Sequence, residues 1–208
     1  MNPTPKQAEE LFLAAKAENG GPWVNHSRFA AHVARLIARH HPAMEEDVGY
    51  VLGLLHDVGR KKKRAAMAHI TEGYHHLTNL GYPLCARIAM THSFPIPEVE
   101  SSASGWVGWE EEKEFTRNYL DGIVFNDYDK LIQLADSIGG IYGIVPMEVR
   151  LVDIALRHGT NEFTAAKWKA LFQIKSEFEQ EIGLDLYQIL EIPGNKPVIP
   201  TELMPYLD

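Results

Sequence analysis

The sequence predicts an all-α fold, a compact bundle of many helices. In most segments apolar residues recur three and four positions apart, which is the spacing of one helix face. Residues that start and stop helices divide the chain at lengths typical of globular helices. No segment alternates polar and apolar residues over the length of a strand, and no internal repeat occurs. These three observations favour helices packed around one core.

The first half of the chain contains clear helix boundaries. Thr4 is a suitable N-cap, Pro5 suits the first helical position, and Gln7 completes a capping box. Gly20 and Gly21 then end this first helix. The helices expected in this half cover residues 5–19, 23–41, 44–58, 66–79 and 83–92.

The second half opens with the least regular segment, residues 93–108, which is long enough to be a mobile or functional loop. Trp106 and Trp109 flank its end. We expect them to anchor the loop to the helices, with stacking on a nucleobase as the alternative. Further helices are expected at 110–120, 126–138, 146–158 and 164–182.

One domain accounts for most of the 208 residues. We expect a single helical domain over residues 1–190, with a core at about 20–140 and C-terminal helices at 146–190. The proline-rich remainder, 191–208, is expected to be an extended tail. The apolar residues of 164–182 are numerous enough for a homodimer contact, so the oligomeric state stays open.

Composition narrows the class of protein. The net charge of −8 argues against a nucleic-acid-binding protein, and the basic run from Arg60 to Arg64 is a local exception. The single cysteine, Cys85, excludes an internal disulfide and fits a reducing compartment. Residues 1–16 lack the apolar centre of a signal peptide, and no apolar run has the length of a membrane span. We therefore expect a cytoplasmic protein without a membrane partner.

Four potential metal ligands follow one another along the chain: His26, the pair His56-Asp57, and Asp136. Each lies on or beside the apolar face of a different expected helix. Burial of an unpaired carboxylate is costly, and two buried carboxylates repel each other, so a cation among them would resolve both problems. Imidazole nitrogen together with carboxylate oxygen suits a transition metal better than calcium.

These residues lie in motifs that resemble the HD superfamily of metal-dependent phosphohydrolases, over about residues 20–140. The three motifs, in the family's order, are His26-Ser27-x-x-Ala30-Ala31, Leu54-Leu55-His56-Asp57-Val58-Gly59 and Leu131-x-x-Leu134-Ala135-Asp136-Ser137. The resemblance implies an HD-domain bundle in which these four residues bind a divalent metal such as Fe, Mn, Ni or Zn. It also implies that a metal-bound hydroxide hydrolyses a small phosphorylated, nucleotide-like substrate.

Two more histidines resemble the ligands of a second metal. His69 opens the pattern His69-x-x-x-Gly73-x-x-x-Leu77, and His92 follows the fifth expected helix. This arrangement is similar to the two-metal branch that includes small bacterial diadenosine-tetraphosphate hydrolases, in which Asp57 would bridge the ions. His75 and His76 are rivals on the same helix, but the spacing favours His69. One ion and two ions both remain open.

Two other branches match less well. The cyclic-di-GMP phosphodiesterases have paired histidines where this chain has Thr91-His92, and their Gly-Tyr-Pro lies downstream, whereas residues 81–83 precede His92 here. The deoxynucleoside 5′-monophosphatases have an acidic residue soon after the His-Asp pair, where this chain has Arg60.

The basic residues after the His-Asp pair suggest a contact with substrate. We expect Asp57 and Arg60 to be catalytic, with Arg60 binding phosphate and stabilising charge in the transition state. Lys61 is either a second phosphate contact or a surface residue, and residues 62–64 are expected to form a solvated loop. Ser27 is rejected as a nucleophile because a metal-bound His26 cannot serve as its base.

Two further hypotheses stand beside the enzyme. A non-catalytic HD-type module would bind a nucleotide or a partner protein and use the metal structurally. A helical nucleic-acid-binding protein would rest only on the basic run, against the acidic charge of the whole chain. Substrate specificity is expected to come from residues 93–115 and the C-terminal helices.

Overall fold

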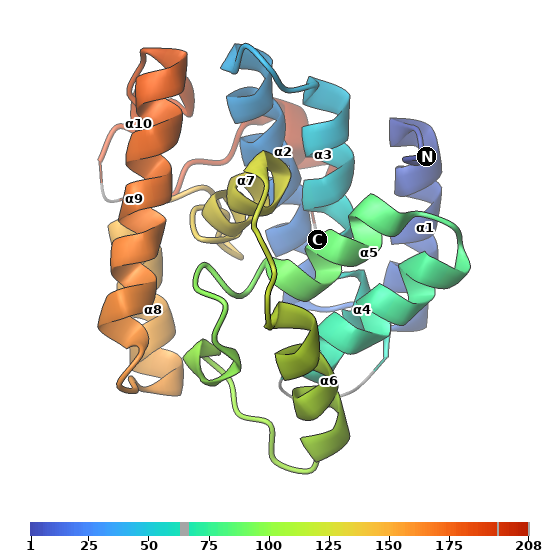
Figure 1. Ribbon diagram of the computed structural model, residues 1–208. Coiled ribbons are helices and arrows are strands. Elements are labelled where there is room, and N and C mark those ends of the chain that lie inside the picture. The colour runs from blue at the N-terminus through green and yellow to red at the C-terminus, as the bar shows by residue number, and fades with distance from the viewer. Residues whose placement is uncertain (63–66, 195, 208) are drawn as a thin grey trace.

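The fold is all-α, as predicted (Figure 1). The computed structural model describes residues 1–62, 67–194 and 196–207, and this part of the chain contains isolated β-bridges but no β-strand. The α-helices are α1 (Pro5–Glu18), α2 (Pro22–His40), α3 (Glu46–Leu55), α4 (Ala68–Asn79), α5 (Pro83–Thr91), α6 (Glu110–Leu120), α7 (Asp127–Asp136), α8 (Met147–His158), α9 (Thr164–Ile182) and α10 (Leu186–Ile189). Three short 3-10 turns complete them: η1 (Val58–Lys61), η2 (Val99–Ser101) and η3 (Thr201–Tyr206).

Helices α2 and α3 lie side by side at the centre of the molecule (Figure 1). They pack closely because glycines of α3 face alanines of α2. A Cβ at Gly53 would lie 2.7 Å from the Cα of Ala31, and a Cβ at Gly49 would lie 2.8 Å from the carbonyl oxygen of Ala34. This close packing brings the first turns of α2 near the end of α3.

A second close approach joins η1 to α4. A Cβ at Gly59 would lie 1.9 Å from the carbonyl oxygen of His69 and 2.5 Å from the amide nitrogen of Gly73. Only a residue without a side chain allows this backbone contact. The spacing His69-x-x-x-Gly73 is therefore explained by packing, because the backbone at both residues lies against Gly59 in the turn that follows the His-Asp pair.

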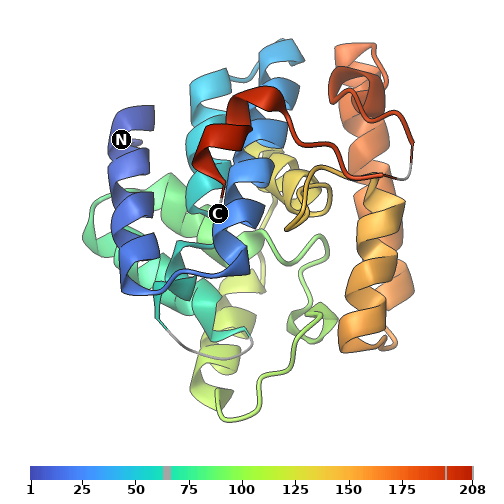
Figure 2. The same ribbon diagram turned by 180° about the vertical axis from the view of Figure 1, so that it is seen from behind.

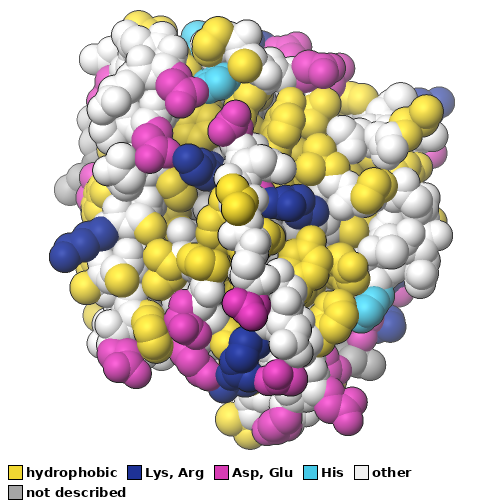
Figure 3. Space-filling model, in the orientation of Figure 1, with side chains coloured by type: hydrophobic (Ala, Val, Ile, Leu, Met, Phe, Trp, Pro, Cys, Tyr) yellow, Lys and Arg dark blue, Asp and Glu magenta, His cyan; other side chains and the backbone are white. Residues whose placement is uncertain are grey.

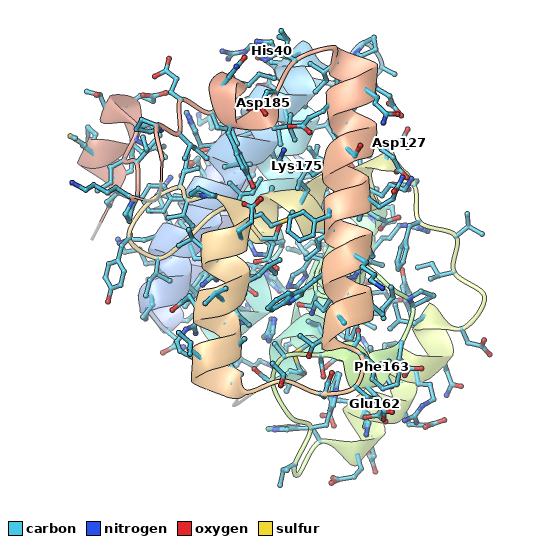
Figure 4. All side chains as sticks on the ribbon, turned by 90° about the vertical axis from the view of Figure 1, so that its left-hand side faces the viewer. His40, Asp127, Glu162, Phe163, Lys175 and Asp185 are labelled. Atoms are coloured by element: carbon cyan, nitrogen blue, oxygen red, sulfur yellow. The ribbon has the colours of Figure 1, made fainter. Side chains whose placement is uncertain are left out.

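The other helices surround this centre. Helix α1 packs against α3 and η1, α5 packs against α4, and α7 packs against α2 and α9. Helices α8 and α9 form an antiparallel hairpin at one side of the molecule (Figures 1 and 4). Acidic side chains line the upper and lower edges of the face seen in Figure 3, in keeping with the net charge of −8.

The irregular segment 93–108 is held by a second apolar cluster. Trp106 is 7% exposed, packs in this cluster with Phe94 and Leu120, and donates a hydrogen bond from Nε1 to Ser102 Oγ at 3.1 Å. Anchoring by Trp106 is therefore confirmed.

One expected helix boundary needs correction, and another lies outside the described residues. The third helix ends at Leu55 rather than at residue 58, because the chain turns at the His-Asp pair and continues as η1. The expected start of the fourth helix at residue 66 and the basic residues 63 and 64 lie outside the described residues, and α4 begins at Ala68.

The C-terminal segment is not simply an extended tail. Val198 pairs with Ile144 through two backbone hydrogen bonds, and residues 201–206 form η3. This turn lies against α2, where the Arg28 guanidinium is 5.2 Å from the ring of Tyr206 (Figure 2). The prediction was wrong because Leu203 supplies an apolar group that is buried against the helices.

No helix in the described part of the chain combines the length and the apolar character needed to cross a lipid bilayer.

The close approach at Gly59 predicts a large loss of stability on substitution. Gly59→Ala should lower the free energy of unfolding by about 3 kcal/mol, because the new methyl group meets backbone atoms that cannot rotate away. Urea unfolding followed by circular dichroism measures the change.

Gly105→Ala is the matched control, since a Cβ at Gly105 meets no atom within 4 Å. Its free energy of unfolding should change by less than about 0.5 kcal/mol. Equal urea midpoints for the two variants would contradict the contact between η1 and α4.

Candidate metal centre

Five elements bring six potential ligands to one place. His26 lies in the second turn of α2, His56 and Asp57 follow α3, and the other three are His69 of α4, His92 after α5, and Asp136 at the end of α7. All except Asp136 are buried, and the carboxylate of Asp136 is 28% exposed. The structure thus collects every ligand that the sequence suggested from a stretch of more than one hundred residues.

The first group of donor atoms has the spacing of ligands around one ion. His26 Nε2 lies 3.2 Å from His56 Nε2 and 2.8 Å from Asp136 Oδ1. His56 Nε2 lies 3.9 Å from Asp136 Oδ1 and from Asp57 Oδ2. Neighbouring donors that each stand about 2.1 Å from one ion are roughly 3.0–3.4 Å apart. The observed distances bracket that spacing.

Backbone carbonyls determine which imidazole nitrogen faces the site. The Nδ1 atoms of His26 and His56 lie 2.6 and 2.7 Å from the carbonyl oxygens of Gly139 and Gly53. His92 Nδ1 lies 3.1 Å from two carbonyl oxygens of α5. A carbonyl oxygen only accepts, so each Nδ1 carries the proton and each Nε2 presents a lone pair to the site.

This arrangement fits a cation. With both Nδ1 atoms protonated, the Nε2 lone pairs of His26 and His56 face each other across 3.2 Å and repel. A divalent ion between them would turn that repulsion into two coordinate bonds. His26, His56 and Asp57 accordingly form one set of three buried residues whose donor atoms can hold a metal ion.

A second set consists of Asp57, His69 and His92. Asp57 Oδ1 lies 3.1 Å from His69 Nε2 and 3.7 Å from His92 Nε2. Oδ1 is buried and has no hydrogen-bond partner in the described part of the chain. Asp57 therefore belongs to both sets, with one oxygen on each side.

Arg60 already places positive charge beside this second set. Its Nε donates to Asp57 Oδ2 at 2.6 Å, and its Nη2 lies 3.2 Å from His69 Nε2. Its side chain is 38% exposed, so the guanidinium also reaches solvent.

Four of the ligands, His56, Asp57, His92 and Asp136, have pKa values shifted toward the protonation states that metal binding requires. Burial lowers the pKa of His56, and burial together with the neighbouring His56 lowers the pKa of His92 to about 3. Burial opposes ionisation of Asp57, but the Arg60 guanidinium and His69 hold its pKa well below the usual range. Burial likewise opposes ionisation of Asp136, but the neighbouring His26 and His56 outweigh it, so its pKa is also lowered.

Three residues that the sequence reasoning missed hold α5 against α7. Asp129 is fully buried and accepts hydrogen bonds from Arg87 and from the Thr91 hydroxyl, the latter at 2.7 Å. Gln133 donates to the carbonyl oxygens of Thr91 and Phe94, on either side of His92. The capping-box spacing Asn126-x-x-Asp129 is the sequence signal that could have found Asp129.

The structure does not bring Lys61 to the ligand cluster. Its Nζ lies 3.3 Å from Glu18 Oε1 and 3.4 Å from His76 Nδ1, on the outer side of η1. His75 is exposed, with its ring against Phe115. Among the three histidines of α4, His69 alone therefore joins the cluster.

A cavity of about 590 Å³ opens onto the cluster. Asp57, His69 and Asp136 line one side, and residues of the loop 93–104 and of the α8–α9 hairpin line the other. This volume is within the range of small-molecule sites.

The lowered pKa values of the two histidines predict how the metal-free protein responds to pH. Unfolded histidine has a pKa of about 6.5, so below that pH the unfolded chain binds protons that buried His56 and His92 do not. Stability should therefore fall as pH decreases below 6.5, by up to about 1.4 kcal/mol per pH unit for each histidine, and for His92 this fall continues to a pH of about 3.

Urea unfolding of metal-free protein between pH 7 and pH 5 measures this slope. His92→Gln should show a shallower slope than the wild-type chain, since one of the two groups is gone. An unchanged slope would contradict the neutral, buried state of His92.

The comparisons with known proteins agree with this geometry. The model of the HD domain family matches residues 23–139, which cover all six potential ligands. Neither the curated proteins nor the solved structures include a significant match to the chain. HD domains generally bind divalent metals and act as phosphohydrolases. The matched region is more than half of the 208 residues, and the chain therefore belongs to the HD domain family.

Proposed function

We propose that this protein is a metal-dependent phosphohydrolase that acts on a small phosphorylated, nucleotide-like substrate. The observation that carries the proposal is the pair of ligand sets that share Asp57 and open, beside Arg60, into a single cavity. A merely structural metal site is normally closed by its protein ligands. An open cavity with a cationic side chain at the ligands favours chemistry on an anionic substrate.

The proposed roles follow from the contacts. His26, His56, Asp57 and Asp136 would hold a first ion, and Asp57, His69 and His92 a second, as in the two-metal branch that includes diadenosine-tetraphosphate hydrolases. A divalent ion supplies Lewis-acid polarisation of a phosphoryl oxygen and lowers the pKa of bound water. Asp57 stays ionised, and one of its oxygens lies toward each set.

Arg60 is the proposed phosphate contact. Its guanidinium lines the cavity while its Nε bonds to Asp57, so other N–H groups can bind a phosphate oxygen. Its fixed position next to the ligands suits it to stabilise charge that builds on the phosphoryl group. We assign no substrate contact to Lys61, because its Nζ is directed to Glu18 and His76.

The alternative is a non-catalytic module that binds a nucleotide or a partner protein. The complete donor set and the cavity beside it favour the enzyme. Only turnover decides between the two.

Removal of the shared carboxylate tests the enzyme. Asp57→Ala should lower kcat/KM by at least about a hundredfold, because both ligand sets lose a member. The assay uses protein loaded with Mn or Fe, with bound metal measured by elemental analysis. The substrates are diadenosine polyphosphates, cyclic dinucleotides and mononucleotides.

Asp127→Ala is the control, since Asp127 is an exposed carboxylate in the first turn of α7 (Figure 4). It should retain wild-type activity. Absence of both bound metal and turnover in the loaded wild-type protein would refute the proposed function.

Arg60 should affect both catalysis and the number of bound ions. Arg60→Gln should lower kcat/KM by about a hundredfold, through loss of the positive charge at the phosphate. The same change frees His69 Nε2 from the guanidinium, so a second Mn ion should bind more tightly to the variant. Calorimetric titration with Mn counts the ions.

Arg39→Gln, which changes a half-exposed arginine of α2, is the matched control and should behave as wild type in both measurements. An unchanged kcat/KM in Arg60→Gln would remove Arg60 from the proposed mechanism.

A further inference from the structure

The cavity wall opposite the metal ligands comes from the α8–α9 hairpin, which lies outside the residues matched by the HD domain family. Its charge contrasts with that of the whole chain. The carboxylates that line the cavity, Asp57 and Asp136, are both potential metal ligands. The lysines and arginines that line it are Arg60, Lys62, Arg150, Arg157 and Lys167. On a chain with a net charge of −8, the cavity is therefore locally cationic.

Arg150 of α8 has an unused donor in this wall. Its side chain is 12% exposed, and its Nε is buried without a hydrogen-bond partner in the described part of the chain. Its Nη1 lies 3.2 Å from Asp153 Oδ2, and the same oxygen lies 2.9 Å from Arg157 Nη2. One carboxylate between two guanidiniums leaves positive charge in excess. A buried N–H group without an acceptor is costly, and an anionic oxygen of a ligand would provide one.

Lys167 of α9 is the second cation of this wall. Its Nζ donates to the carbonyl oxygens of Ser93 and Ser101, at 2.9 and 3.3 Å. An ammonium group has three donors, so one remains. No carboxylate of the described residues forms an ion pair with Lys167. Its positive charge is therefore not neutralised by a neighbour.

Lys167 lines the same cavity as the metal ligands. Burial lowers its pKa to about 8, and the negative charge of Asp136 opposes that change. From the loop side, Ser101 lines the cavity, and its Oγ is buried without a hydrogen-bond partner in the described part of the chain. It is a further neutral donor close to Lys167, which bonds to the carbonyl of the same residue.

We propose that Arg150 and Lys167, with the Ser101 hydroxyl, form a second oxyanion-binding subsite in the cavity. The subsite would take a phosphate or carboxylate group of the substrate while the scissile phosphate lies at the metal ligands. Hydrolysis of the scissile phosphate at the metal ligands rests on the proposed function, whereas anion binding at Arg150 and Lys167 does not. The substrate is thus a molecule with two separated anionic groups.

The subsite also gives the C-terminal helices a function. The family match ends at residue 139, before α8 begins, so the ligands and Ser101 belong to the shared domain, whereas the two cations of the subsite belong to the part that follows it. Selection among phosphorylated molecules would then depend on α8, α9 and the loop 93–102, and the chemistry would depend on α2 to α7.

Binding of inorganic phosphate to the metal-free protein tests the subsite without any turnover. Backbone amide resonances of α8 and of the loop 93–104 report the titration. Arg150→Gln and Lys167→Gln should each raise the dissociation constant at these resonances by about tenfold or more, since each removes a charged hydrogen-bond donor. Thermal unfolding of each variant checks that the fold is retained.

Lys175→Gln is the matched control. Lys175 lies on the same helix as Lys167 but farther from the α8–α9 connection, where Glu162 and Phe163 lie (Figure 4). It does not line the cavity, and it pairs with Glu179 at 2.5 Å. Its substitution by Gln should leave phosphate binding unchanged. If Lys167 only held the loop through two carbonyls, Lys167→Gln would bind phosphate as Lys175→Gln does, and the subsite would be refuted.

A second experiment measures the effect on specificity in the Mn-loaded enzyme. The substrates are alkanediol bisphosphates of increasing chain length and the corresponding monophosphates. At one chain length the bisphosphate should have a kcat/KM about tenfold higher than its monophosphate. Arg150→Gln and Lys167→Gln should lower kcat/KM for the bisphosphate more than for the monophosphate, so that this advantage is lost.

The outcomes separate the two proposals. Phosphate binding that depends on Arg150, in a protein without turnover, would support the subsite and refute the proposed function. Hydrolysis of monophosphates with no advantage for any bisphosphate, together with unchanged phosphate binding in both variants, would refute the subsite and leave the proposed function in place.

Discussion

The structure depends on one electrostatic constraint, which is that donors that repel one another are buried together in the middle of the molecule. The Nε2 lone pairs of His26 and His56 face each other across 3.2 Å, and Asp57 keeps an oxygen without a hydrogen-bond partner in the described part of the chain. Without a cation such an arrangement lowers the stability of a fold. The fold maintains it through backbone contacts that the side chains cannot alter, namely the glycine–alanine packing of α2 on α3 and the approach of η1 to α4.

The same backbone contacts also orient the ligands. The carbonyl of Gly53, a residue that packs against α2, receives the Nδ1 proton of His56, and the carbonyl of Gly139 receives that of His26. Gly53 and Gly139 therefore both allow close helix packing and orient an imidazole ring. The hydrogen bonds of Asp129 and Gln133 help to position His92, because they join the end of α5 to α7. A metal centre of this kind is supported by many residues that never touch the ion.

Most of the site's composition was predictable from sequence because its ligands occur in short motifs with helical surroundings. The six potential ligands and the all-α fold were identified in this way, and the family match covers them. Residues outside the motifs were less predictable from the sequence. Lys61 and Arg60 are neighbours in a basic run, yet they point in different directions from the 3-10 turn. Lys61 contacts Glu18, whereas Arg60 contacts Asp57. The C-terminal residues were read as an extended tail from their prolines, but Leu203 is buried and η3 packs on the bundle.

The sequence by itself determined the helices, the order of the ligands and the protein family, because periodicity, capping residues and motifs are local properties of the chain. Tertiary structure alone decided which cations face the ligands. Arg150 and Lys167 lie in unremarkable amphipathic helices, and their spacing along the chain carries no signal. They line the same cavity as the metal ligands only because the α8–α9 hairpin folds back beside α7. Distances between elements that are remote in sequence depend on how helices pack, and packing is a property of the whole core.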